Sequence, residues 1–109
     1  MAKSPYIAIT LFEFTSDAPD YVPLYREDVT LLYAESEEEA RELAEENFRS
    51  DEETYKNEAG YNVTVTPTAV IDIVAALIDD LSEGGDLYSR HFRDFEAYSK
   101  WEPMLNGPL

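Results

Sequence analysis

Hydrophobic and polar residues alternate most clearly between Asn62 and Leu77, in the sequence NVTVTPTAVIDIVAAL. The odd-numbered positions of this stretch are almost all apolar, and β-branched residues recur along it. A period of two is typical of a β-strand that packs one face against a core, so Ile71 and Ile73 are predicted to share a buried face. Because Pro67 cannot donate a hydrogen bond to a neighbouring strand, we expect a bend or bulge there that divides the run.

The second half of this stretch also fits a helix between Val70 and Leu81. Five apolar residues would share one face of that helix: Ile71, Val74, Ala75, Ile78 and Leu81. Periodicity alone does not separate a short apolar strand from a buried helix. We adopt the strand, because its first half alternates strictly, and keep the helix over 70–81 as the alternative.

Two further strands are predicted near the N-terminus. Residues 6–14 (YIAITLFEF) are apolar on both faces, which is typical of a central strand. Residues 27–35 (EDVTLLYAE) form a second run of β-forming residues, and the intervening stretch 15–25 contains two prolines and is expected to be a loop. We expect these two strands to pair antiparallel across that loop.

The clearest helix signal in the chain begins at Ser36. A serine followed three residues later by Glu39 is the pattern of a capping box, in which side chains satisfy the free N–H groups of the first turn. Four apolar residues at helical spacing are expected to face the sheet: Ala40, Leu43, Ala44 and Phe48. The pattern therefore predicts a helix over about 36–49.

The remaining segments complete a single α+β domain over 1–103. Residues 50–60 are expected to be a polar connection, residues 79–85 a break, and Leu87–Phe92 a short strand. A short C-terminal helix is expected from His91 onward, ended by Pro103 and followed by a loose tail over 104–109. Its aromatic stripe is formed by Phe92, Phe95, Tyr98 and Trp101. The predicted fold is an antiparallel sheet of about four strands, with one face covered by the main helix and the other by the aromatic helix or by a second copy in a homodimer.

Composition makes the chain strongly acidic. Its 24 acidic and 8 basic residues give a formal net charge of −16 over 109 residues. Such a surface repels nucleic acids and anionic membranes and attracts cationic partners. The chain has no cysteine and therefore neither disulfides nor thiolate ligands. No stretch is apolar enough to cross a membrane, and the simplest expectation is a cytoplasmic protein. Solubility alone is the other explanation for this charge.

Much of the charge gathers on the outer face of the predicted main helix. Four glutamates would point to solvent there: Glu38, Glu42, Glu45 and Glu46. We therefore expect a non-enzymatic binding protein that engages a basic protein, as an immunity protein or a regulatory decoy does. No catalytic residue, no cofactor site and no metal site is assigned, because nucleophile, base and ligand spacings are all lacking.

The alternative function is a small enzyme or ligand-binding domain. Its site would combine polar residues of two short segments: Tyr55, Asn57, Glu58, Tyr88, Arg90 and His91. The first three precede Gly60 and also fit a solvated turn. The last three lie on the segment predicted as the closing strand.

Several of these motifs together resemble the small bacterial family DUF4288. The resemblance rests on the order PLYREDVTLLYAESEEEARELAEE, YKNEAG, VIDI and DLYSRHF, with motif segments at Ala34–Ala40, Tyr55–Gly60 and Asp86–Phe92. The chain departs from the family in having Asp86-Leu87 in place of Glu-Val and no tryptophan in the long strand. The resemblance spans roughly residues 6–92 and implies a compact α+β domain. It implies no particular chemistry, because the family has no established activity.

Overall fold

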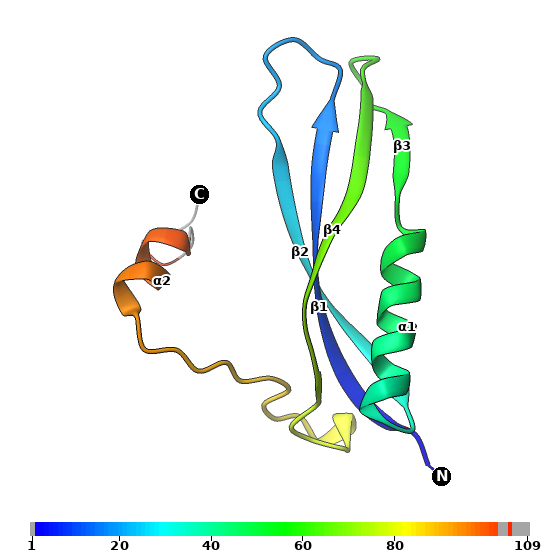
Figure 1. The fold of residues 1–109 in the computed structure, drawn as a ribbon, viewed down its shortest axis with the longest axis vertical. Coiled ribbons are helices and arrows are strands. Elements are labelled where there is room, and N and C mark those ends of the chain that lie inside the picture. The colour runs from blue at the N-terminus through cyan, green and yellow to red at the C-terminus, as the bar shows by residue number, and fades with distance from the viewer. Residues whose placement is uncertain (1, 103–104, 106–109) are drawn as a thin grey trace.

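The computed structural model describes residues 2–102 and residue 105. The elements in chain order are β1 (Ser4–Ser16), β2 (Leu24–Ala34), α1 (Glu37–Ser50), β3 (Glu53–Lys56), β4 (Asn62–Ala75), a short 3₁₀ turn η1 (Leu81–Glu83) and α2 (Phe95–Trp101). The strands form one antiparallel sheet in the order β2-β1-β4-β3, and α1 lies against one face (Figure 1). The predicted α+β fold with four strands and two helices is confirmed.

The strand β1 occupies the centre of this sheet, where its two-sided apolar pattern places it. It pairs with β2 on one side and β4 on the other. Even-numbered residues such as Ala8 and Phe12 face α1, and odd-numbered residues such as Ile7 and Ile9 face the opposite side; all four are buried. The predicted pairing of the first two strands across a loop is confirmed.

The helix α1 begins where the capping signal predicts. The Ser36 hydroxyl oxygen accepts a hydrogen bond from the Glu39 backbone N–H at 3.1 Å. Ala40 and Ala44 are buried against the sheet, where small side chains allow the helix to approach closely. Near the C-terminal end of α1, the Phe48 ring packs on Phe12 with centroids 5.5 Å apart.

The strand β4 runs without a break from Asn62 to Ala75, so the helix over 70–81 is wrong. Its pairing with β1 shifts twice, leaving Thr68 and Ile71 as extra residues. The bulge predicted at Pro67 is present, because the first shift follows that residue directly, but it does not divide the strand. The second bulge makes one expectation wrong: Ile73 is 2% exposed and Ile71 is 38% exposed, so they do not share a buried face.

The fourth strand is not the one predicted. Glu53–Lys56, expected to lie within a polar connection, pairs with the beginning of β4 as β3. Leu87–Phe92, expected to be the closing strand, has no regular secondary structure. In a strand over Leu87–Phe92, each face would present both polar and apolar residues, so neither face would be consistently buried.

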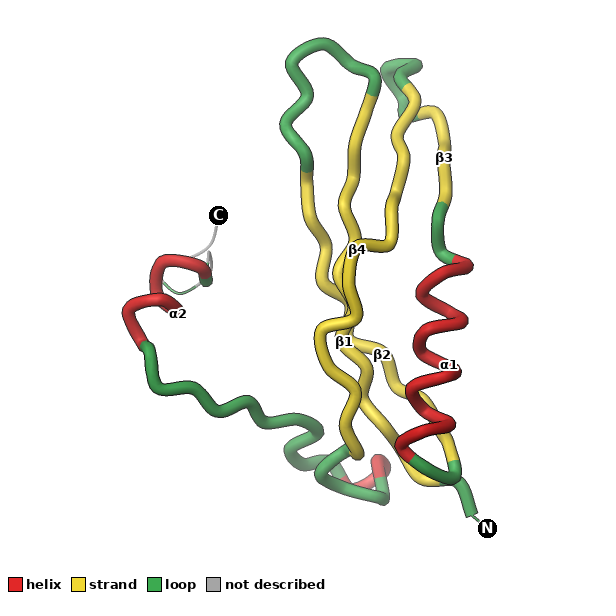
Figure 2. The backbone as a smooth tube through the Cα atoms, viewed as in Figure 1, coloured by secondary structure: helices red, strands yellow, loops and turns green. Residues whose placement is uncertain are grey.

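After β4 the chain forms a C-terminal arm, defined here as residues 76–102. The arm turns back through η1, so that the Leu77 N–H donates to the Leu87 carbonyl at 3.1 Å, and then runs away from the sheet to α2 (Figure 2). The predicted helix starts at Phe95 rather than His91, because the Asp94 carboxylate accepts from the Ala97 N–H at 3.0 Å and caps the helix. Pro103 and the predicted tail, apart from Leu105, lie outside the described residues.

The molecule is long in the direction of its strands, and the arm widens it to one side (Figure 1). Its Cα radius of gyration is 17.0 Å, whereas a compact domain of about this length has about 13 Å. Figure 1 shows α2 standing apart from the sheet on the side opposite α1. The short C-terminal helix is therefore present without closing over the second face of the sheet.

Candidate functional site

The outer face of α1 presents acidic side chains to solvent. Glu38, Glu42 and Glu46 are exposed, and Glu45 is half-buried. The one ion pair found on the described part of this helix joins Arg41 to Glu37 at 3.6 Å, and both of these side chains are more than half exposed. The face therefore keeps a concentrated negative potential, with the N-terminal glutamates favoured by the helix dipole.

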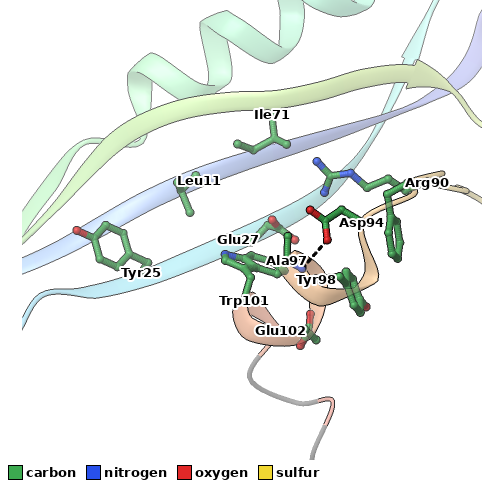
Figure 3. A pocket seen from close by; sticks show the side chains of 11 residues that line it. Leu11, Tyr25, Glu27, Ile71, Arg90, Asp94, Ala97, Tyr98, Trp101 and Glu102 are labelled. Carbon is green, nitrogen blue, oxygen red and sulfur yellow. Dashed lines mark hydrogen bonds between the residues drawn. The ribbon is translucent and has the colours of Figure 1, made fainter.

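A second candidate site lies between the arm and the sheet. An open cavity of about 940 Å³ separates α2 from the face of the sheet that α1 leaves uncovered. The lining residues are Leu11, Tyr25, Glu27 and Ile71 on the sheet and Arg90, Phe92, Asp94, Ala97, Tyr98, Trp101 and Glu102 on the arm. Figure 3 shows Leu11 and Ile71 on the strands and Trp101 and Tyr98 on the turn of α2 that faces them. We call this cavity the groove.

The groove is mainly aromatic and aliphatic, and its four charged residues are Glu27, Arg90, Asp94 and Glu102. Phe92 stacks on Tyr98 with ring centroids 4.6 Å apart, which stiffens the approach of the arm to α2. On the sheet side, the Tyr25 hydroxyl donates to the Glu13 carboxylate at 3.1 Å. This hydrogen bond to a carboxylate, followed by the negative charge itself, raises the pKa of Tyr25, so its hydroxyl stays protonated at neutral pH. The chemistry of the groove suits apolar or aromatic surfaces.

The inner part of the arm is fixed to the sheet by one polar contact. The Tyr88 hydroxyl donates to the Asp72 carboxylate at 2.8 Å, on the face opposite α1. Burial is the main cause that raises the pKa of Tyr88, and the hydrogen bond to Asp72 adds to it. Sequence reasoning assigned Asp72 no role, although a carboxylate in the middle of an apolar strand is a signal that a polar partner faces it.

The structure does not bring together the six residues of the sequence-predicted ligand site. Tyr55 pairs with Val63 at one end of β4, whereas Tyr88 contacts Asp72 towards the other end. Val63 and Asp72 are nine positions apart along β4, which corresponds to about 30 Å of strand. Of the six, only Arg90 lines the groove.

The segment around Asn57 forms the hairpin between β3 and β4. The Asn57 side chain accepts from the Tyr61 N–H at 3.0 Å, and the Asn57 N–H donates to the Tyr61 carbonyl at 2.9 Å. Gly60 has a φ of 91°, which an L-residue with a side chain rarely adopts. The Tyr-x-Asn-x-x-Gly pattern thus builds a turn, and Glu58 at its tip is exposed.

Residues 2–102 and 105 contain neither a metal centre nor a membrane-spanning helix. No group of three or more His, Asp or Glu side chains in these residues is arranged to hold a metal ion, and His91 is exposed. No helix in the same residues is long and apolar enough to cross a membrane.

The comparison with known families agrees with the motifs. The sequence profile described as "Domain of unknown function (DUF4288)" matches residues 5–89. The chain belongs to this family. The matched region includes α1, nearly the whole sheet and the Tyr88–Asp72 contact, whereas Arg90 and α2 lie beyond it. No curated protein and no solved structure matches the chain.

Proposed function

We propose that this DUF4288 protein is a non-enzymatic binding domain whose α1 face docks a basic protein partner. The observation that carries the proposal is the position of the glutamates. They project from a helix whose opposite side is held by the buried Ala40 and Ala44, so the charged face is presented on a rigid support. The net charge of −16 extends the same potential over the whole molecule.

This arrangement favours fast, electrostatically steered association. A surface of one sign raises the local concentration of an oppositely charged partner and increases the association rate more than the final affinity. Exposed ion pairs are each worth about 1 kcal/mol or less, so the partner must also supply apolar contacts. An immunity protein against a basic toxin and a decoy for a basic regulator both fit these requirements.

The test uses a charge-reversed helix in partner capture. Wild-type protein and a variant with Glu38, Glu42, Glu45 and Glu46 changed to Lys are immobilised and exposed to extract of the native host at low salt. We expect a basic protein to be retained by the wild type and lost by the variant. With the purified partner, the association rate should fall steeply as salt rises.

A matched control separates the α1 face from net charge. Changing Glu52, Glu53, Glu58 and Glu83 to Lys also moves the formal net charge from −16 to −8 but leaves α1 untouched. Partner association with this control should stay close to wild type. A captured partner whose association rate is indifferent to salt and to the α1 reversal contradicts the proposal.

A second candidate function is ligand binding in the groove. The observation in its favour is the cavity of about 940 Å³, whose aromatic rings suit an aromatic ligand. Its one cation, Arg90, suits an anionic group on that ligand, although the carboxylates of Glu27, Asp94 and Glu102 also line the cavity. Trp101 is the only tryptophan in the chain and lines this cavity, so its fluorescence reports occupancy. The anionic dye anilinonaphthalene sulfonate should quench Trp101 in the wild type and bind more weakly to Arg90→Gln. Equal binding by both excludes an anion site at Arg90.

A further inference from the structure

The uncovered side of the sheet exposes a row of apolar side chains. We call the side opposite α1 the open face. Its exposed apolar residues are Tyr25, Val29, Leu31 and Tyr33 on β2 and Ile71 on β4. Their relative exposures run from 38% to 64%, although β-strand residues with such side chains usually pack against a second layer.

The arm exposes a second apolar surface that matches the first. Phe95 and Trp101 are each 63% exposed, and Phe92 is 53% exposed. All three belong to the aromatic stripe, with Phe95 and Trp101 in α2 and Phe92 in the segment just before it. A helix of seven residues is too short to be stable in water without packing. Within one chain the groove keeps these two surfaces apart.

Charge decides which partner fits these surfaces. Residues 86–102 carry three basic and four acidic side chains, whereas residues 1–85 carry five basic and twenty acidic ones. The outer part of the arm, residues 86–102, is thus nearly neutral, whereas residues 76–85 add three carboxylates and no cation. The open face exposes mostly aromatic and aliphatic groups. Two copies of this acidic chain can approach each other through these two surfaces while the α1 face of each copy points away from the other copy.

We propose that the open face is covered by a second copy of this chain, with the two arms exchanged. In this two-fold dimer the arm of each copy lies across β2 on the open face of the other, and Phe95 and Trp101 insert among the exposed β2 side chains. The groove of each copy is thereby filled by its partner. This inference goes beyond the proposed function, because it assigns an occupant to a surface that the basic partner does not use.

The area available is sufficient for a stable dimer. Eight apolar residues are exposed on the two surfaces, five on the open face and three on the arm. Aromatic side chains bury about 150–250 Å² when fully covered, so covering the exposed half of the five aromatic rings in both copies removes on the order of 1,000 Å², to which the three aliphatic side chains add. Stable interfaces bury about 1,200–2,000 Å².

The Tyr88–Asp72 contact defines which part of the arm is exchanged. Tyr88 holds the inner arm on its own sheet, with its hydroxyl 2.8 Å from the Asp72 carboxylate. Residues 89–94 between Tyr88 and α2 have no helix or strand. Six extended residues span about 20 Å, which is enough to carry α2 beyond the edge of its own sheet and onto a neighbouring copy.

The first test measures mass in solution. The full chain is studied by light scattering and sedimentation over a wide concentration range, at low and at moderate salt. We expect twice the 12.4 kDa chain mass at high concentration. Because two acidic chains repel each other, salt should strengthen the dimer. A mass of 12.4 kDa at every concentration and salt overturns the proposal.

Paired variants test which surfaces are used. Phe95→Ala with Trp101→Ala alters the arm, and Val29→Thr with Leu31→Thr alters the open face; each pair should raise the dimer dissociation constant about tenfold or more. The matched control is Val22→Thr, an 80% exposed valine in the loop before β2, which should leave the dissociation constant unchanged. Circular dichroism checks that each variant is folded. A dimer that is insensitive to both pairs overturns the proposal.

Cross-linking distinguishes exchange between copies from closure within one chain. The chain has no cysteine, so a Val29→Cys, Ala97→Cys double variant contains only the introduced thiols. Exchanged arms should give a disulfide-linked dimer on a non-reducing gel, together with a concentration-dependent blue shift of Trp101 emission. A cross-linked monomer alone shows that α2 closes on its own sheet and overturns the proposal.

The dimer and the proposed function fail independently. Reversing the α1 glutamates should abolish capture of the basic partner without weakening the dimer. Altering the arm should weaken the dimer without abolishing capture. Salt should act on the two associations in opposite directions.

Discussion

Similar aromatic residues are buried in one region of this chain and exposed to solvent in another. In the body formed by the sheet and α1, Phe12 is 1% exposed, packs against Phe48 and has the Arg26 guanidinium 4.9 Å from its ring centre. In the C-terminal arm, Phe95 is 63% exposed and its ring stacks with that of Tyr98 in the same helix, with centroids 6.4 Å apart. Composition therefore does not separate core from surface here. The difference lies in whether a neighbouring element supplies the second layer.

The comparison is sharpest for aromatic truncations, which should show the largest effect. Phe12→Ala should destabilise the body by about 3–5 kcal/mol, because it leaves a cavity under α1. Trp101→Ala should change the same unfolding free energy by about 0.5 kcal/mol or less in dilute solution. Urea unfolding followed by far-ultraviolet circular dichroism measures both. Similar losses for the two variants would mean that α2 packs against the body.

Two isoleucines on β4 provide the next contrast. Ile73→Ala should cost about 2–5 kcal/mol, because Ile73 lies in the core beside Ala8 and Leu32. Ile71→Ala, at a bulge on the open face, should cost about 1 kcal/mol or less at low protein concentration. The same urea experiment applies. Equal costs would contradict the second bulge.

The two helix caps extend the comparison to hydrogen bonds. Ser36→Ala should lower the stability of the body by about 0.5–2 kcal/mol, because the first turn of α1 loses an acceptor. Asp94→Ala removes the equivalent acceptor from α2 but should leave the thermal midpoint of the body unchanged. Amide hydrogen exchange should show faster exchange in α2 alone. An unchanged melt for Ser36→Ala would mean that Ser36 does not cap α1.

The smallest expected effect concerns Tyr88, where the two regions meet. Tyr88→Phe should cost about 0.5–1.5 kcal/mol at neutral pH. The raised pKa of Tyr88 means that its contribution is complete below the ordinary tyrosine value of about 10 and is lost as pH rises through the folded-state value. The stabilities of wild type and Tyr88→Phe should therefore converge as pH rises above about 10. A constant difference across that range would exclude the hydrogen bond to Asp72 as its source.

Sequence patterns predicted the body well where local signals and packing agree. The Ser36 cap, the two-sided pattern of β1 and the pairing of β1 with β2 all rest on neighbours close in the chain. The edge strand β3 was missed because its four residues are exposed and show no apolar alternation. The Asn57–Gly60 turn before β4 was a usable signal, since a hairpin turn requires a strand on each side.

The groove could not be predicted in the same way. Its sheet side comes from residues on three strands and its other side from residues 90–102, and only the path of the arm brings them together. The motif Leu87–Phe92 was wrongly interpreted as a strand, because β-forming residues do not reveal whether a pairing edge is available. Arg90 was predicted only as a polar residue of the segment that also contains Tyr88 and His91, and Trp101 was recognised only as part of the aromatic stripe.

The two bulges of β4 change which of its residues face α1. Odd-numbered residues face α1 before the first extra residue, and even-numbered residues face it between the two. Odd-numbered residues face α1 again after the second, so Val65 and Ile73 both do. Between them the inward positions fall at Pro67, Val70 and Ile73, a spacing of three that imitates a helical period. Because neither Thr68 nor Ile71 lies opposite a residue of β1, deleting either one leaves every other residue of β4 facing the same β1 partner, and each single deletion should straighten the strand locally without exchanging its two faces.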